Sequence, residues 1–236
     1  MTALDPRQVL GDIDGGRVLD VATGAGGFVG FLLDGLRGHG EIIGIDANPA
    51  RGAAFAEAFG DRDDVRFVEM DAHRLAFADG SFDTVCVSNS LHHFADPAPV
   101  LAEMLRVVRP GGHVVVNEMY RDSQSETQMT HVLLHHWWAA VNTAGGEVHR
   151  ETYRRAEILA ILDDLGLAGL RLADVADPDE DPHDPATLAD LEAAIDRHVA
   201  LAAGHPDLER RGEELRARLR ATGARGATQL VAVGRR

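Results

Sequence analysis

The first half of the chain alternates short apolar runs with helical patterns, and this alternation constrains the fold more than any other feature. The runs are continuously apolar, as in Val85-Cys86-Val87, which is typical of strands covered on both faces of a parallel sheet. Strands that alternate with crossover helices form an α/β fold. We expect strands at Arg17–Val21, Glu41–Asp46, Val65–Met70, Phe82–Ser88 and Gly112–Glu118, and helices near Gly27–Arg37, Pro49–Phe59 and Pro97–Val108.

The second half of the chain has a different pattern, in which helices dominate. Residues 122–143 are predicted to form a helix rich in histidine and tryptophan, which a Gly145-Gly146 break follows. A segment rich in proline and aspartate at 177–185 is too acidic and too interrupted for regular structure. The remaining expected elements are helices at Arg154–Leu165, Ala186–Ala203 and Asp207–Thr222, and strands at Leu167–Val175 and Thr228–Val233.

Charge and cysteine content exclude several classes of function. The net charge of -15 repels phosphate backbones, so nucleic acid is a poor partner. All basic side chains in the Lys+Arg count are arginine, which excludes lysine Schiff bases and the phosphate-binding lysine of P-loop enzymes. The single cysteine, Cys86, excludes a disulfide framework and is consistent with a reducing compartment. With no signal-peptide pattern and no run long enough to cross a bilayer, we expect a cytoplasmic protein without a membrane partner.

A strand that runs directly into a glycine turn and a helix marks the first candidate binding site. Gly24 and Gly26 let the backbone pass close to a ligand, and the amides at the start of the following helix favour a negative group. A tight turn without any ligand has the same pattern, so this motif alone is weak. Asp46 strengthens it, because it ends the next strand twenty residues beyond Gly26, where a carboxylate can accept both hydrogens of a ribose diol.

Polar residues also follow the third and fourth expected strands. Asp71 comes after the third strand, and the run Ser88-Asn89-Ser90-Leu91-His92-His93 ends the fourth. The carboxyl ends of parallel strands meet at one edge of a sheet, and open α/β sheets bind ligands there, near the reversal of strand order. We therefore expect a single site built from four successive strand ends.

The motifs VLDVATGAGG, GIDANP, DAHRLAFADGSFDTV, SNSLHHF and VLAEMLRVVRPGGHVVVNE resemble, in this order, the class I S-adenosylmethionine-dependent methyltransferases, closest to the ubiquinone/menaquinone-biosynthesis branch. The resemblance covers about residues 17–118. It implies S-adenosyl-L-methionine as cofactor and in-line methyl transfer to a small-molecule acceptor. The implied cofactor contacts are Asp20, Ala22, Gly24 and Gly26 around the methionine moiety, Asp46 at the ribose, Ala47, Asp71 and Ala72 at the adenine, and Ser88 at the methionine amine.

The resemblance also implies the fold, a Rossmann-like doubly wound α/β domain with a seven-stranded, mostly parallel sheet and a helical cap. We expect one domain over residues 1–236, with its core at about 17–118, 154–175 and 226–234. The helical cap would comprise 119–152 and a helical insertion 178–225. The polar helices of the insertion would pack on the sheet, or form a dimer interface, so a monomer and a homodimer both remain open.

One residue of the glycine motif departs from the commonest family pattern. Ala22 stands where that pattern has its first glycine, and an alanine there costs little space. A dinucleotide-dependent dehydrogenase is the nearest alternative to a methyltransferase. Its fingerprint needs a third glycine where this chain has Val29, and the later motifs have no place in such enzymes.

His92 and His93 follow the fourth strand, beside the predicted methyl group, and are the candidate catalytic residues. Methyl transfer from a sulfonium is an in-line displacement, which needs alignment and exclusion of water rather than a protein nucleophile. An acceptor atom that must lose a proton needs a base, and histidine suits that task near neutral pH. Packing in the cofactor pocket is the alternative role for both.

A second histidine group lies in the helix predicted over 122–143. His131 and His135 are four residues apart and share one face of a helix, which suits bidentate ligation of a metal. Glu118 and His149 could complete a site for a divalent ion such as zinc or iron. The alternative is that these side chains line a substrate or only pack. Insertions after the fifth strand build the acceptor pocket in this class of enzyme, so the candidate substrate contacts are His136 and Trp137.

Two further functions remain open from the sequence. The chain could bind S-adenosylmethionine without transferring its methyl group, as a scaffold for cyclisation or as a sensor. It could also be a methyltransferase assisted by the divalent metal. The identity of the acceptor lies outside the sequence, because this scaffold hosts many substrates.

Overall fold

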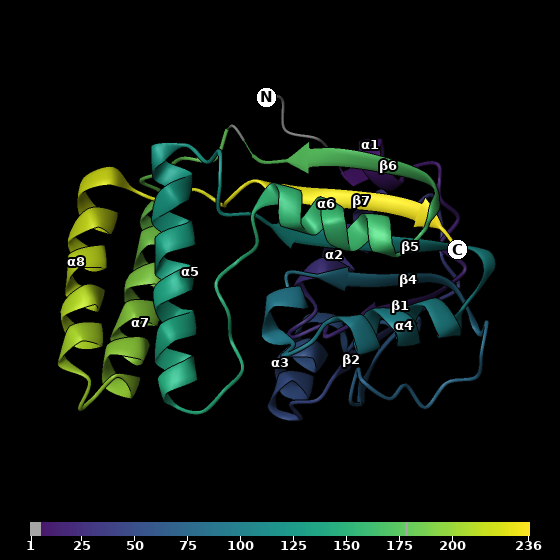
Figure 1. The fold of residues 1–236 in the computed structure, drawn as a ribbon, viewed down its shortest axis with the longest axis horizontal. Helices are drawn as coiled ribbons and strands as arrows, with labels where there is room; N and C mark the ends of the chain where they lie inside the picture. The colour runs from purple at the N-terminus through teal and green to yellow at the C-terminus, as the bar shows by residue number, and fades with distance from the viewer. Residues whose placement is uncertain (1–5, 178) are drawn as a thin grey trace.

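A computed structural model describes residues 6–177 and 179–236 and places one sheet between two layers of helices (Figure 1). The strand order is β3-β2-β1-β4-β5-β7-β6, and β7 runs antiparallel to both of its neighbours. This arrangement confirms the expected seven-stranded, mostly parallel sheet. The strands are β1 (Arg17–Val21), β2 (Glu41–Asp46), β3 (Val65–Glu69), β4 (Phe82–Ser88), β5 (Val108–Met119), β6 (Ala168–Val175) and β7 (Gln229–Arg235).

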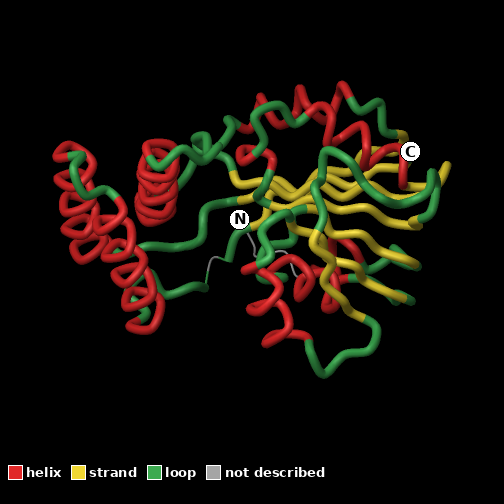
Figure 2. The backbone as a smooth tube through the Cα atoms, turned by 90° about the horizontal axis from the view of Figure 1, so that it is seen from below, coloured by secondary structure: helices red, strands yellow, loops and turns green. Residues whose placement is uncertain are grey.

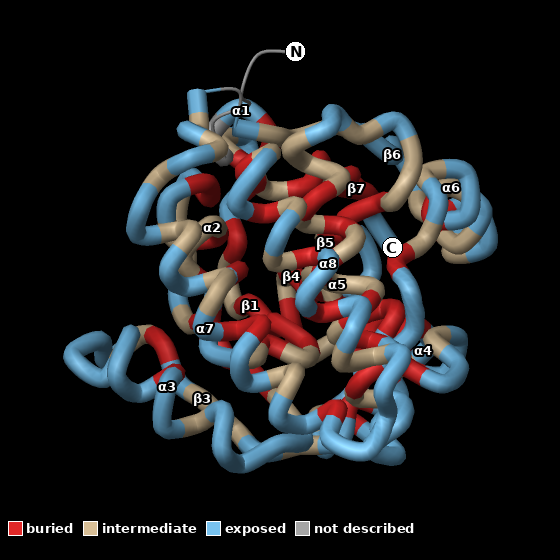
Figure 3. Tube along the Cα trace, turned by 90° about the vertical axis from the view of Figure 1, so that its left-hand side faces the viewer, coloured by how far each residue is buried: buried red, intermediate tan, exposed pale blue. Residues whose placement is uncertain are grey.

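Both faces of the sheet are buried, which is why its central strands are continuously apolar. In β1, Leu19 and Val21 pack in one apolar cluster, whereas Val18 packs in the cluster on the opposite face. Figure 2 shows helices on either side of the strands, and Figure 3 shows buried residues along them. The first cluster includes α4 (Ala98–Val107) and α6 (Arg155–Asp164), and the second α1 (Pro6–Leu10), α2 (Gly27–Gly35) and α3 (Ala50–Phe59).

Two elements begin more than one residue away from their expected starts. β5 begins at Val108 instead of Gly112, because Val108 already pairs with Phe82 ahead of an irregularity in the register. α5 (Glu126–Ala144) begins after Ser125, although the helical pattern suggested residue 122. Ser125 forms a capping box with Gln128, in which each side chain accepts a hydrogen bond from the other residue's backbone amide.

Three helices stand beside the sheet and form a bundle of their own (Figure 1). They are α5, α7 (Pro185–Leu201) and α8 (Pro206–Thr222). The expectation that the two polar helices pack on the sheet is wrong, because their apolar side chains pack with α5. The shared cluster includes Leu134, Trp137, Ile195, Leu215 and Leu219.

No helix within the described ranges is both long enough and apolar enough to cross a membrane. Residues 1–5, which belong to the segment that lacks a signal-peptide pattern, and Pro178 of the acidic segment lie outside the described residues.

Candidate active site

A cavity of about 790 Å³ opens at the carboxyl ends of the central strands. The chain reverses its strand order between β1 and β4, so the loops after these strands diverge and leave a crevice. Of the predicted cofactor contacts, only Gly26 is absent from the cavity wall. The predicted contacts that line it are Asp20, Ala22, Gly24, Asp46, Ala47, Asp71, Ala72 and Ser88.

The glycine turn after β1 depends on left-handed backbone geometry. Gly24 has a φ of 57° and Gly26 a φ of 87°, in the region that glycine adopts without strain. A Cβ atom on Gly26 would lie 2.4 Å from the ring of Phe59, so Gly26 serves the packing of α3 against the turn. Ala22 also has a positive φ, of 55°. Its departure from glycine therefore costs conformational energy, on the order of 1 kcal/mol, rather than space.

Asp46 links the glycine turn to the end of β2. Its Oδ2 accepts a hydrogen bond from the Gly24 amide at 3.0 Å, and its Oδ1 accepts one from the Asn48 amide at 2.8 Å. These bonds fix the carboxylate at the cavity wall. Each oxygen keeps a further lone pair, so the group can still accept hydrogen bonds from a diol.

Asp20 is a buried carboxyl at the bottom of the glycine turn, and it is 1% exposed. Its Oδ2 accepts a hydrogen bond from the Thr23 hydroxyl at 2.6 Å, whereas its Oδ1 has no partner among the described residues. Burial raises the pKa of Asp20 to about 7, and the charge of nearby Asp46 adds to the shift. An unpartnered carboxyl oxygen in the wall of a cavity suits a cationic ligand group, such as an ammonium.

Asp71 and Ser88 complete the predicted set at the next two strand ends. Asp71 accepts hydrogen bonds from the backbone amide and the ring of His73, which lower the pKa of its carboxyl and keep it ionised. The carbonyl oxygen of Ser88 accepts a hydrogen bond from the Ser90 hydroxyl at 2.7 Å. It retains one lone pair for a ligand donor.

An amide network beneath the cavity was missed in the sequence. The Nδ2 atoms of Asn89 and Asn117 both donate to Oε1 of Gln229, at 3.0 and 2.5 Å, and Asn117 also donates to the Ser88 hydroxyl. Asn117 and Gln229 line the cavity. The one signal for Asn117 was a polar residue directly after the apolar run Val114–Val116, whereas Gln229 comes from a strand more than a hundred residues away.

Four histidines from three segments of the chain converge beside the cavity. His92 and His93 lie in the short helix η1 (Leu91–His93), His135 lies on α5, and His149 lies in the loop after α5. The Nε2 atom of His135 is 2.9 Å from Nε2 of His92 and 3.1 Å from Nε2 of His149. The four rings each place a nitrogen within 4.8 Å of the others. The fold thus joins two groups that appeared separate in the sequence, and we call these four residues the histidine cluster.

Desolvation by surrounding atoms, together with repulsion from neighbouring histidines, favours the neutral forms of His93, His135 and His149. It lowers the pKa of His93, whose ring is still exposed on the cavity side, to about 3 and the pKa of His149 to about 4, and it also lowers the pKa of His135. His93 lines the cavity, whereas His92 is fully buried behind it. The role of His93 as catalytic base therefore stays a prediction, which its position in the cavity wall supports.

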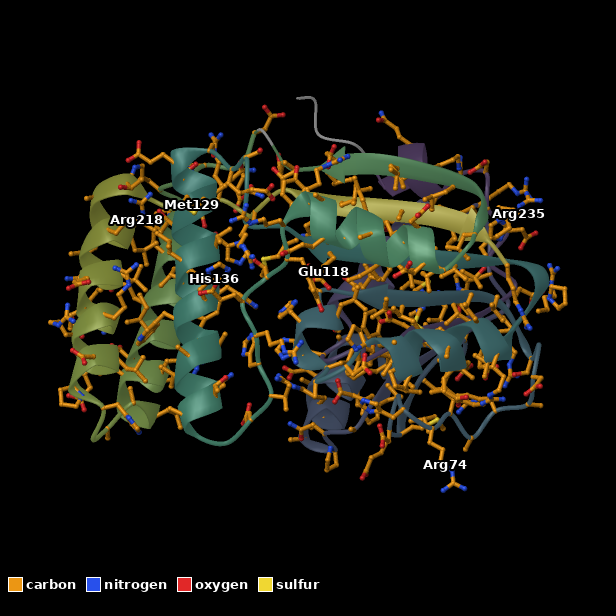
Figure 4. The ribbon with its side chains drawn as sticks, in the orientation of Figure 1. Arg74, Glu118, Met129, His136, Arg218 and Arg235 are labelled. Atoms are coloured by element: carbon orange, nitrogen blue, oxygen red, sulfur yellow. The ribbon has the colours of Figure 1, made fainter. Side chains whose placement is uncertain are left out.

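The predicted metal set of Glu118, His131, His135 and His149 is not brought together. His131 lies apart from the cluster, because its Nδ1 accepts a hydrogen bond from the Ala227 amide at 2.9 Å. Glu118 reaches the cluster through His92, whose Nδ1 lies 2.8 Å from its Oε1. In Figure 4, Glu118 lies at the end of the sheet that faces α5.

The two predicted substrate contacts occupy different environments. Trp137 is buried in the helical bundle, where its Nε1 donates to the Leu208 carbonyl at 2.9 Å, and it does not reach the cavity. This position corrects its assignment to substrate binding. His136 lies on α5 (Figure 4), with its Nε2 2.9 Å from the Thr152 hydroxyl, and lines a second hollow of about 440 Å³ with His149 and Glu151.

Comparisons with known proteins agree with this geometry. Residues 19–116 match the family model described as a methyltransferase domain. A demethylmenaquinone methyltransferase of Thermus thermophilus is 41% identical over 103 residues, which is 43% of this chain and 46% of the relative. A ubiquinone biosynthesis O-methyltransferase of Alkalilimnicola ehrlichii is 36% identical over 121 residues, 50% of this chain and 47% of the relative.

The structure of the [4+2]-cyclase SpnF superimposes with a TM-score of 0.63 at 22% identity, covering 95% of this chain and 76% of that one. This likeness concerns the fold. The chain spans about half the length of the curated relatives it matches, and the matched part contains the glycine turn and the strand ends around the cavity.

Proposed function

We propose that the chain is a class I S-adenosylmethionine-dependent methyltransferase, since residues 19–116 match a methyltransferase domain, and that it methylates a small-molecule acceptor. The observation that carries the proposal is the cavity at the reversal of strand order, with a carboxyl at each of the first three strand ends. These are Asp20, Asp46 and Asp71. Asp20 and Asp46 keep hydrogen-bonding capacity on the cavity side.

The residues present fit S-adenosylmethionine. The unpartnered Oδ1 of Asp20 suits the ammonium of the methionine moiety, since a buried carboxylate is stabilised by a cation. Asp46 is held by two amides in a position to accept hydrogen bonds from the ribose hydroxyls. The cavity volume lies within the usual range for sites of cofactors and drug-sized ligands.

When bound, this cofactor supplies an electrophilic methyl group on a sulfonium that leaves as a thioether. The protein's task is to bind, orient and exclude water. Phe28, Phe31 and Phe94 contribute apolar surface to the cavity wall. The strand-end carboxyls fix the cofactor, which leaves the side near His93 and α5 for the acceptor.

The helical bundle is the element to which we assign acceptor selection. The loop after α5 meets η1 through the hydrogen bond from the Arg150 amide to the His92 carbonyl, at 2.9 Å. This contact joins the segment that follows the bundle helix to the cofactor-binding core. One relative carries an O-methyltransferase name, and an oxygen acceptor on a small molecule is compatible with the polar amides around Asn117.

The remaining assignments rest on composition. The net charge of -15 disfavours nucleic acid as a partner, and the one cysteine, Cys86, is free and buried. We therefore place the reaction in the cytoplasm, with no nucleic acid or membrane partner and as a monomer or homodimer.

Titration of S-adenosylhomocysteine into the purified protein by calorimetry tests the cofactor site. We expect micromolar binding that weakens by about 1–3 kcal/mol in Asp46→Ala, because a charged acceptor is lost. Glu69→Ala is the matched control, since Glu69 pairs with Asp46 in the strand register but does not line the cavity.

Absence of both heat and thermal stabilisation at millimolar S-adenosylhomocysteine would contradict the cofactor assignment. Release of S-adenosylhomocysteine from S-adenosylmethionine in the presence of a panel of phenolic and quinol acceptors tests the transfer. If the protein binds S-adenosylhomocysteine but releases none from S-adenosylmethionine with all acceptors of the panel, a scaffold or sensor would be favoured over a methyltransferase.

A further inference from the structure

We propose that His92, His93, His135 and His149 form a mononuclear site for a divalent transition-metal ion of the zinc class. The four side chains come from η1, α5 and the loop after α5, so the ion would join the helical bundle to the cofactor-binding core. This inference is independent of methyl transfer, because uptake of an ion is measured without any acceptor.

The spacing of the ring nitrogens fits a tetrahedral ion. Zinc–nitrogen bonds of about 2.0–2.1 Å place neighbouring ligand nitrogens roughly 3.3 Å apart. The Nε2 atoms of His92, His135 and His149 already lie 2.9 and 3.1 Å apart along the chain of contacts. His93 adds a fourth ring, whose centroid is 4.1 Å from that of His149. A few tenths of an ångström bring the two short contacts to the tetrahedral spacing, whereas the widest nitrogen separation in the cluster, up to 4.8 Å, contracts when the ion binds.

Hydrogen bonds alone do not account for both short contacts of the His135 ring. Its Nε2 atom has either one hydrogen or one in-plane lone pair, so it forms one hydrogen bond at a time. If His135 donates from its Nε2 to His92, that nitrogen has neither a second hydrogen nor an in-plane lone pair for His149. One of the two short nitrogen–nitrogen contacts then lacks a hydrogen bond. A cation between the lone pairs satisfies the nitrogens together.

The residues behind the cluster orient its rings as metal ligands are oriented. Glu118 and His92 are both fully buried, and their contact is the carboxylate–histidine pair that turns Nε2 toward a metal. Asn142 lies 3.0 Å from Nδ1 of His149. With its amide turned so that the oxygen accepts from that Nδ1, the Nε2 lone pair of His149 is free for the ion.

The ligand chemistry selects the class of ion. Four imidazoles with no direct carboxylate ligand suit zinc, cobalt, nickel or copper, whereas magnesium and calcium prefer oxygen ligands. His93 is exposed at the cavity, whereas His92 and His149 are buried. The cavity side is therefore the path by which an ion enters.

Metal uptake by the chelator-treated wild-type protein tests the proposal. We expect one equivalent of Zn²⁺ to bind with micromolar or tighter affinity, and Co²⁺ to give the visible absorption of a tetrahedral nitrogen site. X-ray absorption of the zinc-loaded wild type should show imidazole nitrogens at about 2.0–2.1 Å. This measurement needs no variant and so does not depend on the folding of one.

Three variants separate this site from other arrangements. His149→Ala and His93→Gln should weaken binding at least tenfold, and Glu118→Gln by about 10–100-fold, because it releases the His92 ring. His131→Asn is the matched control, since asparagine keeps an acceptor for the Ala227 amide. It should bind zinc as the wild type does.

Two results would overturn the proposal. One is a folded wild-type protein, verified by circular dichroism, that takes up neither Zn²⁺ nor Co²⁺ at about 100 μM. The other is uptake that persists in His149→Ala and His93→Gln but is lost in His131→Asn, which would assign the ion to a different set of residues.

Discussion

Nδ1 of His92 lies 2.8 Å from Oε1 of Glu118, and neither side chain has any exposed surface. The other oxygen of Glu118 accepts a hydrogen bond from the backbone amide of Leu91 at 3.0 Å. The end of β5 therefore fixes both the ring and the backbone of η1, the segment that separates the cofactor cavity from α5. A single buried carboxylate serves two donors there, and its removal affects both.

Replacement of Glu118 by alanine should lower the free energy of unfolding by about 3 kcal/mol. The cause is that His92 and the Leu91 amide lose their acceptor in a place that water does not reach. Urea denaturation measures the change. Glu103→Ala removes a half-buried carboxylate that also accepts a backbone amide, and should cost clearly less. An effect of Glu118→Ala below about 1 kcal/mol would show that this contact contributes little to stability.

Replacement of Ala22 by glycine should raise the free energy of unfolding by about 1 kcal/mol. Ala22 has a φ of 55°, where a Cβ atom is strained and glycine is not. Ala25→Gly in the same turn is the control, because Ala25 lacks a positive φ and its replacement should be destabilising. Equal losses from the two variants in chemical denaturation would refute the strain at position 22.

The buried carboxyl of Asp20 should make stability fall as pH rises. Its pKa is about 7 in the folded protein, compared with about 3.9 for an unfolded chain, so the native state holds a proton that the unfolded chain releases between these values. This contribution favours the native state in full below about pH 4 and is lost as pH rises through about 7, by about 4 kcal/mol in total. Asp20→Asn, which keeps an acceptor for Thr23, removes it.

Unfolding free energies of wild type and Asp20→Asn across about pH 4 to 8 measure this effect. Their difference isolates Asp20 from the other carboxyls, several of which have lowered pKa values and act in the opposite direction. A difference that stays constant over this range would mean that Asp20 does not titrate there.

The fold was largely predictable because the parallel strands carry their own signal. Strands β1, β2 and β4 have the predicted bounds, since a strand buried on both faces is an unbroken apolar run. The cavity wall was predictable for a related reason, as parallel strands end at one edge of the sheet. The start of β5 was not, because the extended conformation at Val108 depends on pairing with Phe82 in another strand.

The histidine cluster shows the limit of local patterns. Helical spacing places His131 and His135 on one face of α5. His131, one turn earlier on the helix, accepts a hydrogen bond from the Ala227 amide, and of the two histidines only His135 reaches η1. The close partners of His135 are His92 in η1 and His149 in the loop after α5, and no periodicity in the sequence connects these segments. Tertiary placement of α5 against the core decides which histidines meet.

The packing of α8 against α5 supports a final prediction, which also tests the position of Trp137. Helix propensity alone predicts that Gly212→Ala in α8 is stabilising by about 1 kcal/mol. A Cβ atom at Gly212 would, however, lie 2.5 Å from Cζ2 of Trp137 and 2.9 Å from Cγ2 of Val199. The indole is anchored by its hydrogen bond to the Leu208 carbonyl, so it cannot move aside freely.

We expect Gly212→Ala to lower the free energy of unfolding by about 1–3 kcal/mol, because overpacking outweighs helix propensity. In a Trp137→Phe background the collision with the larger ring is gone, and the same substitution should cost less or become stabilising. Affinity for S-adenosylhomocysteine should not change in Gly212→Ala, since Trp137 packs in the bundle and not in the cavity wall. A stabilised Gly212→Ala variant would mean that α8 lies farther from Trp137 than the 2.5 Å approach implies. That result would contradict the packing of α8 on α5 in the bundle.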